Sequence, residues 1–190
     1  MLLFEFENNL TSQDVYAIIQ KDCQSFLEAI GNKPKSNMLY RGVAIYAAKP
    51  IQKKQVHLTS RKPMTTNNEI HHLINDYFTR QFGEPFRNAL FVSGDHTQAS
   101  GYGNTVLSIF PIGDFTFVWS PGVNDMYDVT WPRPGGFSNV TPSQEAVDYT
   151  LEPYKYTNKS FTAAIHSGNE IMIRCNEYYA VTQTVVEEWK

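Results

Sequence analysis

Two stretches of the chain carry apolar residues at helical spacing, and each has end signals that fit a helix. The first begins with the capping-box-like segment 11–14 and ends at Gly31, because a side-chain cap starts a helix and glycine commonly stops one. The second begins at Thr66, has Glu69 at the capping-box position and ends at Gly83. The apolar stripes of the two helices are Val15, Ile18, Ile19, Phe26, Leu27 and Ile30, then Ile70, Leu73, Ile74, Tyr77, Phe78 and Phe82.

Most of the remaining pattern predicts strands. The expected β-rich runs are residues 38–47, 89–93, 105–111, 114–120, 171–174 and 178–185. The two runs on either side of Ile112-Gly113 predict a hairpin. Helices come early and strands late, with no repeat and no shift in composition, so we expect one α+β domain over residues 1–190. Its core should be antiparallel-rich β structure with helices packed on it.

The segment between Pro121 and Pro142 lacks a strong period and is rich in Gly and Pro. It is too long for a simple connection, which indicates a functional loop. A short helix should follow from Thr141, with Pro142 at its first and Gln144 at its third position.

Composition excludes several classes of protein. Hydrophobic residues make up 42% of the 190 and charged residues 18%, which indicates a folded domain and not a disordered chain. A net charge of −3 argues against broad binding to nucleic acid. The local basic cluster Lys53, Lys54, Arg61 and Lys62 is interpreted as a solvated loop.

The cysteines and the first ten residues give information about the cellular compartment of the protein. Cys23 and Cys175 give neither a disulfide framework nor metal-ligand spacing, and adjacent His71 and His72 also lack it. The first ten residues have no basic segment, and no apolar run approaches the roughly 20 residues of a membrane span. We expect a cytoplasmic protein with no metal, no membrane partner and a monomeric state.

Three polar residues interrupt or begin apolar strands. Arg41 lies inside a run that continues to Ala47, so its charge must face an anion, water or a salt-bridge partner. Ser93 ends an apolar strand before a Gly-rich segment, and Glu170 begins the run Ile171-Met172-Ile173. Each is a candidate site residue, because polar groups at strand ends are available to a ligand.

Taken in order, these motifs resemble those of the ADP-ribosyltransferase superfamily. The matching residues are Tyr40-Arg41-Gly42, then Phe91-Val92-Ser93 with Ala99 and Tyr102, then Glu170-Ile171-Met172-Ile173, within residues 39–185. The resemblance implies the fold of that superfamily and a mono-ADP-ribosyltransferase of microbial or bacteriophage type, such as a bacterial effector, acting in the host cytoplasm if phage-encoded. It implies NAD as substrate and an acceptor macromolecule of unknown type.

The resemblance also implies roles for single residues. Glu170 would be the catalytic carboxylate that stabilises the charged ribose, Ser93 would position it, and Arg41 would hold a diphosphate oxygen or a ribose hydroxyl. The implied NAD-binding residues are Tyr40, Arg41, Gly42, Ser93 and Tyr102. Here the Gly42 backbone would grip the carboxamide and the tyrosines would stack on a ring.

Two departures from the family pattern affect these expectations. Gly94-Asp95 follows Ser93 where the family has Thr-Ser, and Gly168 stands where arginine-modifying members have Glu or Gln. We therefore expect an acceptor other than arginine, recognised by residues 154–169, with Phe161 and His166, or by residues 119–142. Glu177 is the alternative to Glu170 as the catalytic acid. The alternative functions are an NAD glycohydrolase and a non-catalytic binding or virion-associated protein on the same fold.

Overall fold

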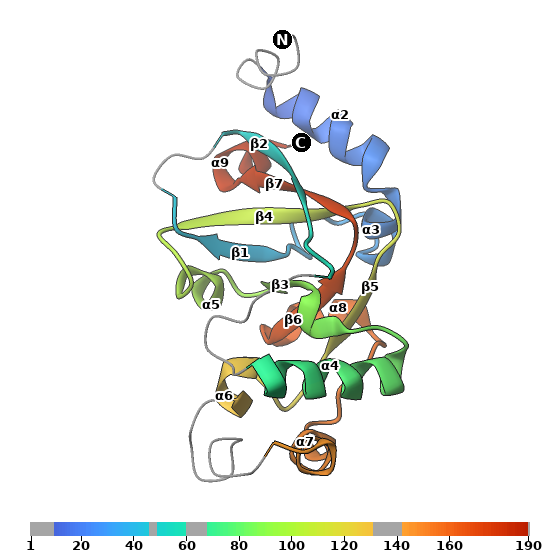
Figure 1. Cartoon of the computed structure of the whole chain (residues 1–190). Helices are drawn as coiled ribbons and strands as arrows, with labels where there is room; N and C mark the ends of the chain where they lie inside the picture. Colours follow the sequence, from blue (N-terminus) through green and yellow to red (C-terminus); the bar gives the residue numbers. More distant parts are fainter. Residues whose placement is uncertain (1–9, 46–48, 60–67, 131–141, 190) are drawn as a thin grey trace.

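The protein is built on one antiparallel sheet. The computed structural model describes residues 10–45, 49–59, 68–130 and 142–189. Seven strands pair in the order β2-β7-β4-β1-β3-β6-β5, and all of these pairings are antiparallel (Figure 1). The strands are β1 (Tyr40–Val43), β2 (Ile51–Gln55), β3 (Leu90–Ser93), β4 (Thr105–Ile112), β5 (Thr116–Trp119), β6 (Glu170–Arg174) and β7 (Glu177–Thr182). The expected α+β class with an antiparallel β core is confirmed.

The sheet consists of two halves that meet at one residue pair. Strands β1 and β3 are joined by Tyr40 opposite Ser93, whereas β1 pairs with β4 along its whole length. We call β2, β7, β4 and β1 the upper half-sheet, and β3, β6 and β5 the lower half-sheet, after their places in Figure 1. Because a single pair holds them, the two halves part on either side of it.

Helices cover the sheet and enclose two cores. They are α2 (Ser12–Asp22), α3 (Gln24–Ala29), α4 (Asn68–Phe82), α5 (His96–Ser100), α6 (Met126–Thr130), α7 (Gln144–Leu151), α8 (Phe161–Ser167) and α9 (Gln183–Glu187), with 3-10 turns η1 (Phe86–Asn88) and η3 (Glu152–Tyr154). The first core contains residues of α2, α3, α8 and α9, and the second contains residues of α4, α6 and α7. Strand β6 serves both, since Ile171 and Ile173 lie in the first core and Met172 in the second. This explains why its sequence is apolar at consecutive positions.

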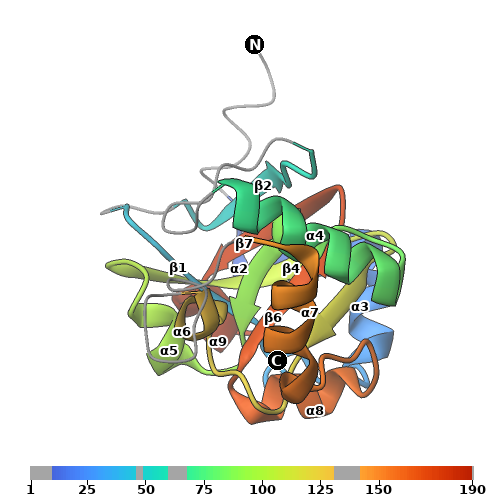
Figure 2. The ribbon, with the colours of Figure 1, turned by 60° about the horizontal axis from the view of Figure 1, so that its bottom comes forward.

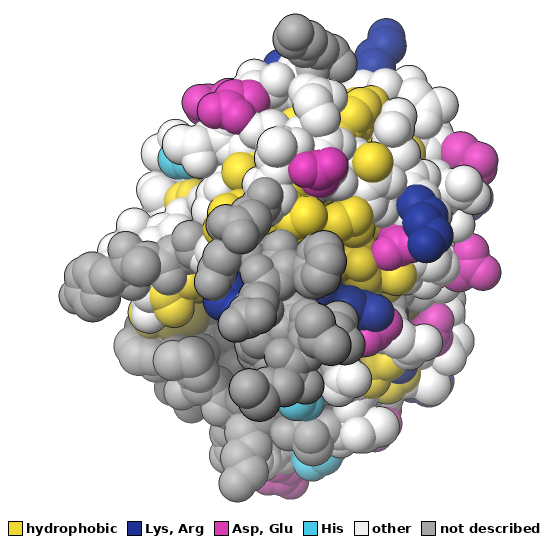
Figure 3. Space-filling view, turned by 90° about the horizontal axis from the view of Figure 1, so that it is seen from above, with side chains coloured by type: hydrophobic (Ala, Val, Ile, Leu, Met, Phe, Trp, Pro, Cys, Tyr) yellow, Lys and Arg dark blue, Asp and Glu magenta, His cyan; other side chains and the backbone are white. Residues whose placement is uncertain are grey.

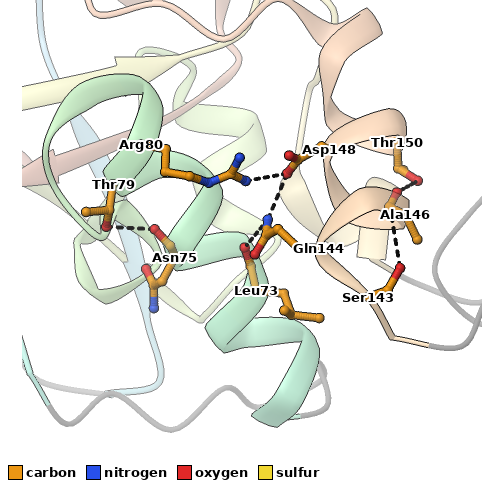
Figure 4. A network of polar contacts seen from close by, with 9 residues as sticks. All are labelled: Leu73, Asn75, Thr79, Arg80, Ser143, Gln144, Ala146, Asp148 and Thr150. Carbon is orange, nitrogen blue, oxygen red and sulfur yellow. Dashed lines mark hydrogen bonds and ion pairs between the residues drawn. The ribbon is translucent and has the colours of Figure 1, made fainter.

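Polar contacts fix helix α7 on helix α4. In Figure 2, α4 lies in front of the sheet. Arg80 forms an ion pair with Asp148 at 2.6 Å. The side-chain amide of Gln144 donates to the Leu73 carbonyl at 3.1 Å and to Asp148 at 2.7 Å (Figure 4). Together these contacts hold α4 in place over the second core.

The first predicted helix is divided in two. The capping box forms as expected, with Thr11 and Asp14 each bonding the other's backbone amide. Cys23, however, leaves the helical conformation at φ −116°, and the chain continues as α3. The break lets both helices turn buried residues, such as Ile19 and Phe26, into the first core.

The other predicted helices are found, and α7 starts later than predicted. Helix α4 ends before Gly83 as expected, while Thr66 lies outside the described residues. Helix α7 is capped by Ser143, whose side chain accepts from the Ala146 amide, so Gln144 is its first residue and not its third. Thr141 also lies outside the described residues.

The predicted hairpin at Ile112-Gly113 is wrong. Strand β4 pairs with β1 and β7, whereas β5 pairs with β6 at the far edge of the sheet. The turn at Gly113 therefore carries the chain from the upper to the lower half-sheet. The last predicted run also ends early, because the chain becomes helical as α9 after Thr182.

The basic cluster is only partly a loop. Lys53 and Lys54 lie on the edge strand β2, and Lys53 forms an ion pair with Glu177 of β7 at 2.8 Å. Arg61 and Lys62 lie outside the described residues. On the face shown in Figure 3, the coloured basic side chains are scattered, and some lie beside acidic ones. Within the described ranges, no helix is long and apolar enough to cross a bilayer.

Candidate functional site

A cavity of about 650 Å³ lies where the two half-sheets part. It is lined by all six residues that the resemblance singled out: Tyr40, Arg41, Gly42, Ser93, Tyr102 and Glu170. They come from β1, β3, the turn after α5, and β6. The volume is within the range of small-molecule and cofactor sites, roughly 300–1,000 Å³.

Strand register places three of these residues in one row. Tyr40 lies opposite Ser93 across β1 and β3, and Ser93 lies opposite Glu170 across β3 and β6. Residues directly opposite in antiparallel strands are close neighbours on one face. Motifs that are far apart in the sequence are thus brought side by side at the junction of the half-sheets.

Ser93 fixes the turn that leads to Glu170. Its side chain is buried, and its hydroxyl donates to the Gly168 carbonyl at 2.5 Å. The same oxygen accepts from the Asp95 amide at 2.9 Å and lies 3.2 Å from Oε1 of Gln98. Ser93 therefore ties the ends of β3 and α8 to the start of α5.

The segment before α6 holds the first residue of β6. The Glu170 amide donates to the Asn124 carbonyl at 2.9 Å, and Oε1 of Glu170 accepts from the Met126 amide at 3.3 Å. The Gln98 side-chain amide donates to the same Asn124 carbonyl at 2.6 Å. These bonds orient the carboxylate of Glu170 within the cavity wall.

Arg41 spans the gap between the half-sheets. Its Nη1 donates to the Phe91 carbonyl of β3 at 2.8 Å. Among the described residues no carboxylate forms an ion pair with Arg41. The alternative, in which Arg41 forms a salt bridge within the sheet, is therefore not found among the described residues.

Close packing requires the glycine at position 42. A Cβ atom built on Gly42 would lie 2.0 Å from the backbone oxygen of Ala99 in α5. We expected this glycine to admit a ligand to the backbone. That expectation stays a prediction, and the structure adds a separate reason for glycine, since α5 occupies the space that a side chain would need.

Three cavity residues were missed from the sequence, His71, Arg87 and Gln98, whereas Asn124, Asp125, Tyr127 and Asp128 were predicted only as part of the segment 119–142. Arg87 carried a usable signal, because it is a charged residue between Phe86 and Phe91. Burial lowers its pKa, and the negative charge of Glu170 opposes that shift. Burial also raises the pKa of the Asp125 carboxyl, with a contribution from Asp128. For Asp125 and Asp128, which lie in a Gly- and Pro-rich segment, no periodic signal was present.

The two segments that were predicted to bind the acceptor have different structures. Residues 154–169 are not a loop, because they include α8, and its Phe161 is buried in the first core. Nε2 of His166 lies 2.7 Å from Oδ1 of Asn37. In the second segment, residues 131–141 lie outside the described residues, while Asn124, Asp125, Tyr127 and Asp128 line the cavity.

The alternative acid Glu177 lies elsewhere. It is paired with Lys53 across β2 and β7 and does not line the cavity. Gly168, two residues before Glu170, has φ +73°, and a Cβ atom there would lie 3.2 Å from Cβ of Asp95. A Glu or Gln at this position would be strained as well as crowded.

The described part of the cavity combines two arginines, which suit an anionic ligand, with carboxylates and aromatic rings. It offers the guanidinium groups of Arg41 and Arg87, the Glu170 carboxylate, and the exposed rings of Tyr102 and Tyr127. No group of His, Cys, Asp and Glu side chains that could hold a metal ion occurs among the described residues. Comparisons with models of protein families, with curated proteins and with solved structures find no match for this chain.

Proposed function

We propose that this protein is a mono-ADP-ribosyltransferase that cleaves the nicotinamide–ribose bond of NAD and passes ADP-ribose to an acceptor other than arginine. The observation that carries the proposal is the row Tyr40–Ser93–Glu170, with Arg41 beside it, in one cavity at the junction of two half-sheets. The two half-sheets also support an ADP-ribosyltransferase-like fold.

The chemistry needs a carboxylate at this place. When the bond between ribose C1′ and nicotinamide breaks, its electron pair leaves with nicotinamide, which departs as a neutral molecule. The ribose becomes oxocarbenium-like, as in glycoside cleavage, and the Glu170 carboxylate stabilises that charge beside the ribose 2′-hydroxyl. The acceptor then attacks C1′ and gives up a proton. No general acid is required.

The other cavity residues bind and orient NAD in this proposal. Arg41, Tyr40 and Tyr102 line the cavity. In the proposal, Arg41 binds a ribose hydroxyl or a diphosphate oxygen, and the tyrosines supply rings for stacking. Ser93 acts on Glu170 through the Gly168 carbonyl. The backbone of Gly42 is available to the carboxamide at the cavity wall.

Gly168 supports an acceptor other than arginine. A guanidinium acceptor would need a carboxylate or amide at position 168, and the left-handed backbone and the contact with Asp95 disfavour any side chain there. A hydroxyl, a thiol, a carboxylate or a nucleic-acid group fits the remaining site better.

Incubation with NAD labelled on its adenine, in the presence of a cell lysate, tests the proposal. We expect label on a macromolecule, and digestion with nuclease or protease identifies its class. Release of free ADP-ribose alone would make the protein an NAD glycohydrolase. Absence of any NAD cleavage would make it a non-catalytic binding protein, and label found mainly on arginine would overturn the choice of acceptor.

A further inference from the structure

Four arginines lie in the described part of the chain, and three of them have partners within it. Arg80 is paired with Asp148, Arg174 with Glu84, and Arg41 donates to the Phe91 carbonyl. Arg87 is the most buried of the four, at 9% exposure. None of the described residues accepts a hydrogen bond from its guanidinium, and its Nε is buried without a partner.

The fold nevertheless fixes Arg87 firmly. Its backbone amide donates to Oδ1 of Asn75 on α4 at 2.9 Å, and its guanidinium lies 5.1 Å from the centre of the Phe91 ring. Both Arg87 and Phe91 line the cavity. The charge of Glu170 acts on Arg87 without an ion pair between them.

An arrangement of this kind costs stability. A buried charge without a hydrogen-bonded counterion is unfavourable in the free protein, because it has lost its hydration without replacement. The burial that lowers the pKa of Arg87 is a sign of that cost. A ligand anion inside the cavity would remove it, and a guanidinium presents a planar fork that matches phosphoryl oxygens.

We propose that Arg87 is the phosphate-binding residue of the cavity and that it holds the diphosphate of the dinucleotide. The identity of the ligand rests on the proposed function, whereas the anion site rests on Arg87 itself. A dinucleotide is favoured over a polymer backbone because Arg87 is too deeply buried for a chain running along the surface. Arg41, the residue expected from the sequence to bind the diphosphate, is then left for the ribose and for the Phe91 carbonyl.

Calorimetric titration with ADP tests this assignment without requiring NAD cleavage. Arg87→Met should weaken ADP binding at least about tenfold, since a charge-assisted bond to phosphate is lost. Arg80→Met is the matched control, because Arg80 is exposed and outside the cavity, and it should bind ADP as the wild type does. Without ligand, Arg87→Met should melt no lower than the wild type, because it removes a buried unpaired charge.

Arg87→Lys keeps the charge and loses the fork, so its ADP affinity should lie between those of the wild type and Arg87→Met. If Arg87→Met fails to fold, the ADP affinity of Arg87→Lys alone tests the assignment. Equal ADP affinity in the wild type and in both Arg87 variants, or no ADP binding by the wild type, would overturn the assignment. Tighter binding of a 5′-phosphorylated oligonucleotide than of ADP would overturn the choice of a dinucleotide.

The two proposals fail in different ways. Cleavage of NAD by the wild type, together with ADP binding that does not depend on Arg87, would keep the proposed function and reject the phosphate site. ADP binding that depends on Arg87, in a protein that leaves NAD intact, would keep the phosphate site and reject the proposed function.

Discussion

The two ends of the strand pair β3–β6 are built on opposite principles. At the closed end, where Leu90 lies opposite Ile173, the neighbouring Arg174 pairs with Glu84 and donates to the Pro85 carbonyl at 3.1 Å. At the open end, where Ser93 lies opposite Glu170, the chain forms a cavity that contains acids and arginines. The closed end pairs its arginine within the chain, whereas at the open end Arg87 has no ion-pair partner among the described residues. The difference indicates that the open end is organised for a ligand at some cost in stability.

The largest effect expected at the open end is that of Glu170→Gln. Removing the negative charge should lower the rate of NAD cleavage by about 10²–10³-fold, because its stabilisation belongs to the transition state. The thermal midpoint should stay close to that of the wild type. A fluorescent NAD analogue, followed in single turnovers, measures the rate.

Glu177→Gln is the matched control, since Glu177 begins the next strand along the chain, β7, but is paired with Lys53. It should cleave NAD almost as fast as the wild type. If Glu177→Gln lost activity and Glu170→Gln kept it, the acid would have been assigned to the wrong strand.

Arg174→Ala tests the closed end. Loss of the ion pair with Glu84 and of the bond to the Pro85 carbonyl should lower the free energy of unfolding by about 1–3 kcal/mol. Glu84 keeps its bond from Thr116, which limits the loss. Urea denaturation measures the change, and NAD cleavage by the folded variant should be unaffected. A fall in activity as large as that of Glu170→Gln would show that the two ends are not separate.

The smallest effect concerns Arg41, at the junction of the half-sheets. Arg41→Lys keeps the positive charge and loses the planar fork, so NAD affinity should fall about fivefold, which is about 1 kcal/mol. Equilibrium binding of NAD in the Glu170→Gln background, in which cleavage is slow, measures the affinity with little turnover. Full affinity in this variant would assign Arg41 to the Phe91 carbonyl alone.

Local signals in the sequence were predictive where neighbours in the chain decide the structure. The capping box at Thr11 and Asp14 forms, and Gly83 ends α4, because both depend on backbone groups within a few residues. The runs that became β3 and β6 were found because they are apolar, and a covered sheet buries consecutive residues.

Local sequence signals did not predict which distant strands pair with each other. Nothing near Gly113 distinguishes a hairpin turn from a crossing between half-sheets, since the difference lies in which distant strand takes up β5. The candidate site shows the same division. Ser93 and Glu170 stood out as polar residues at the ends of apolar strands, whereas Asp125 belongs to the wall only because the chain folds back over β6.

The position of β7 has a consequence for folding during synthesis on the ribosome. Residues 177–182 form the last of the seven described strands, yet they lie inside the sheet between β2 and β4. A nascent chain that has not yet released these residues presents two unpaired strand edges, which are sites for association with other chains. The upper half-sheet therefore closes only after the other described strands have been made, and a chaperone that shields β2 and β4 until then would protect the protein from aggregation.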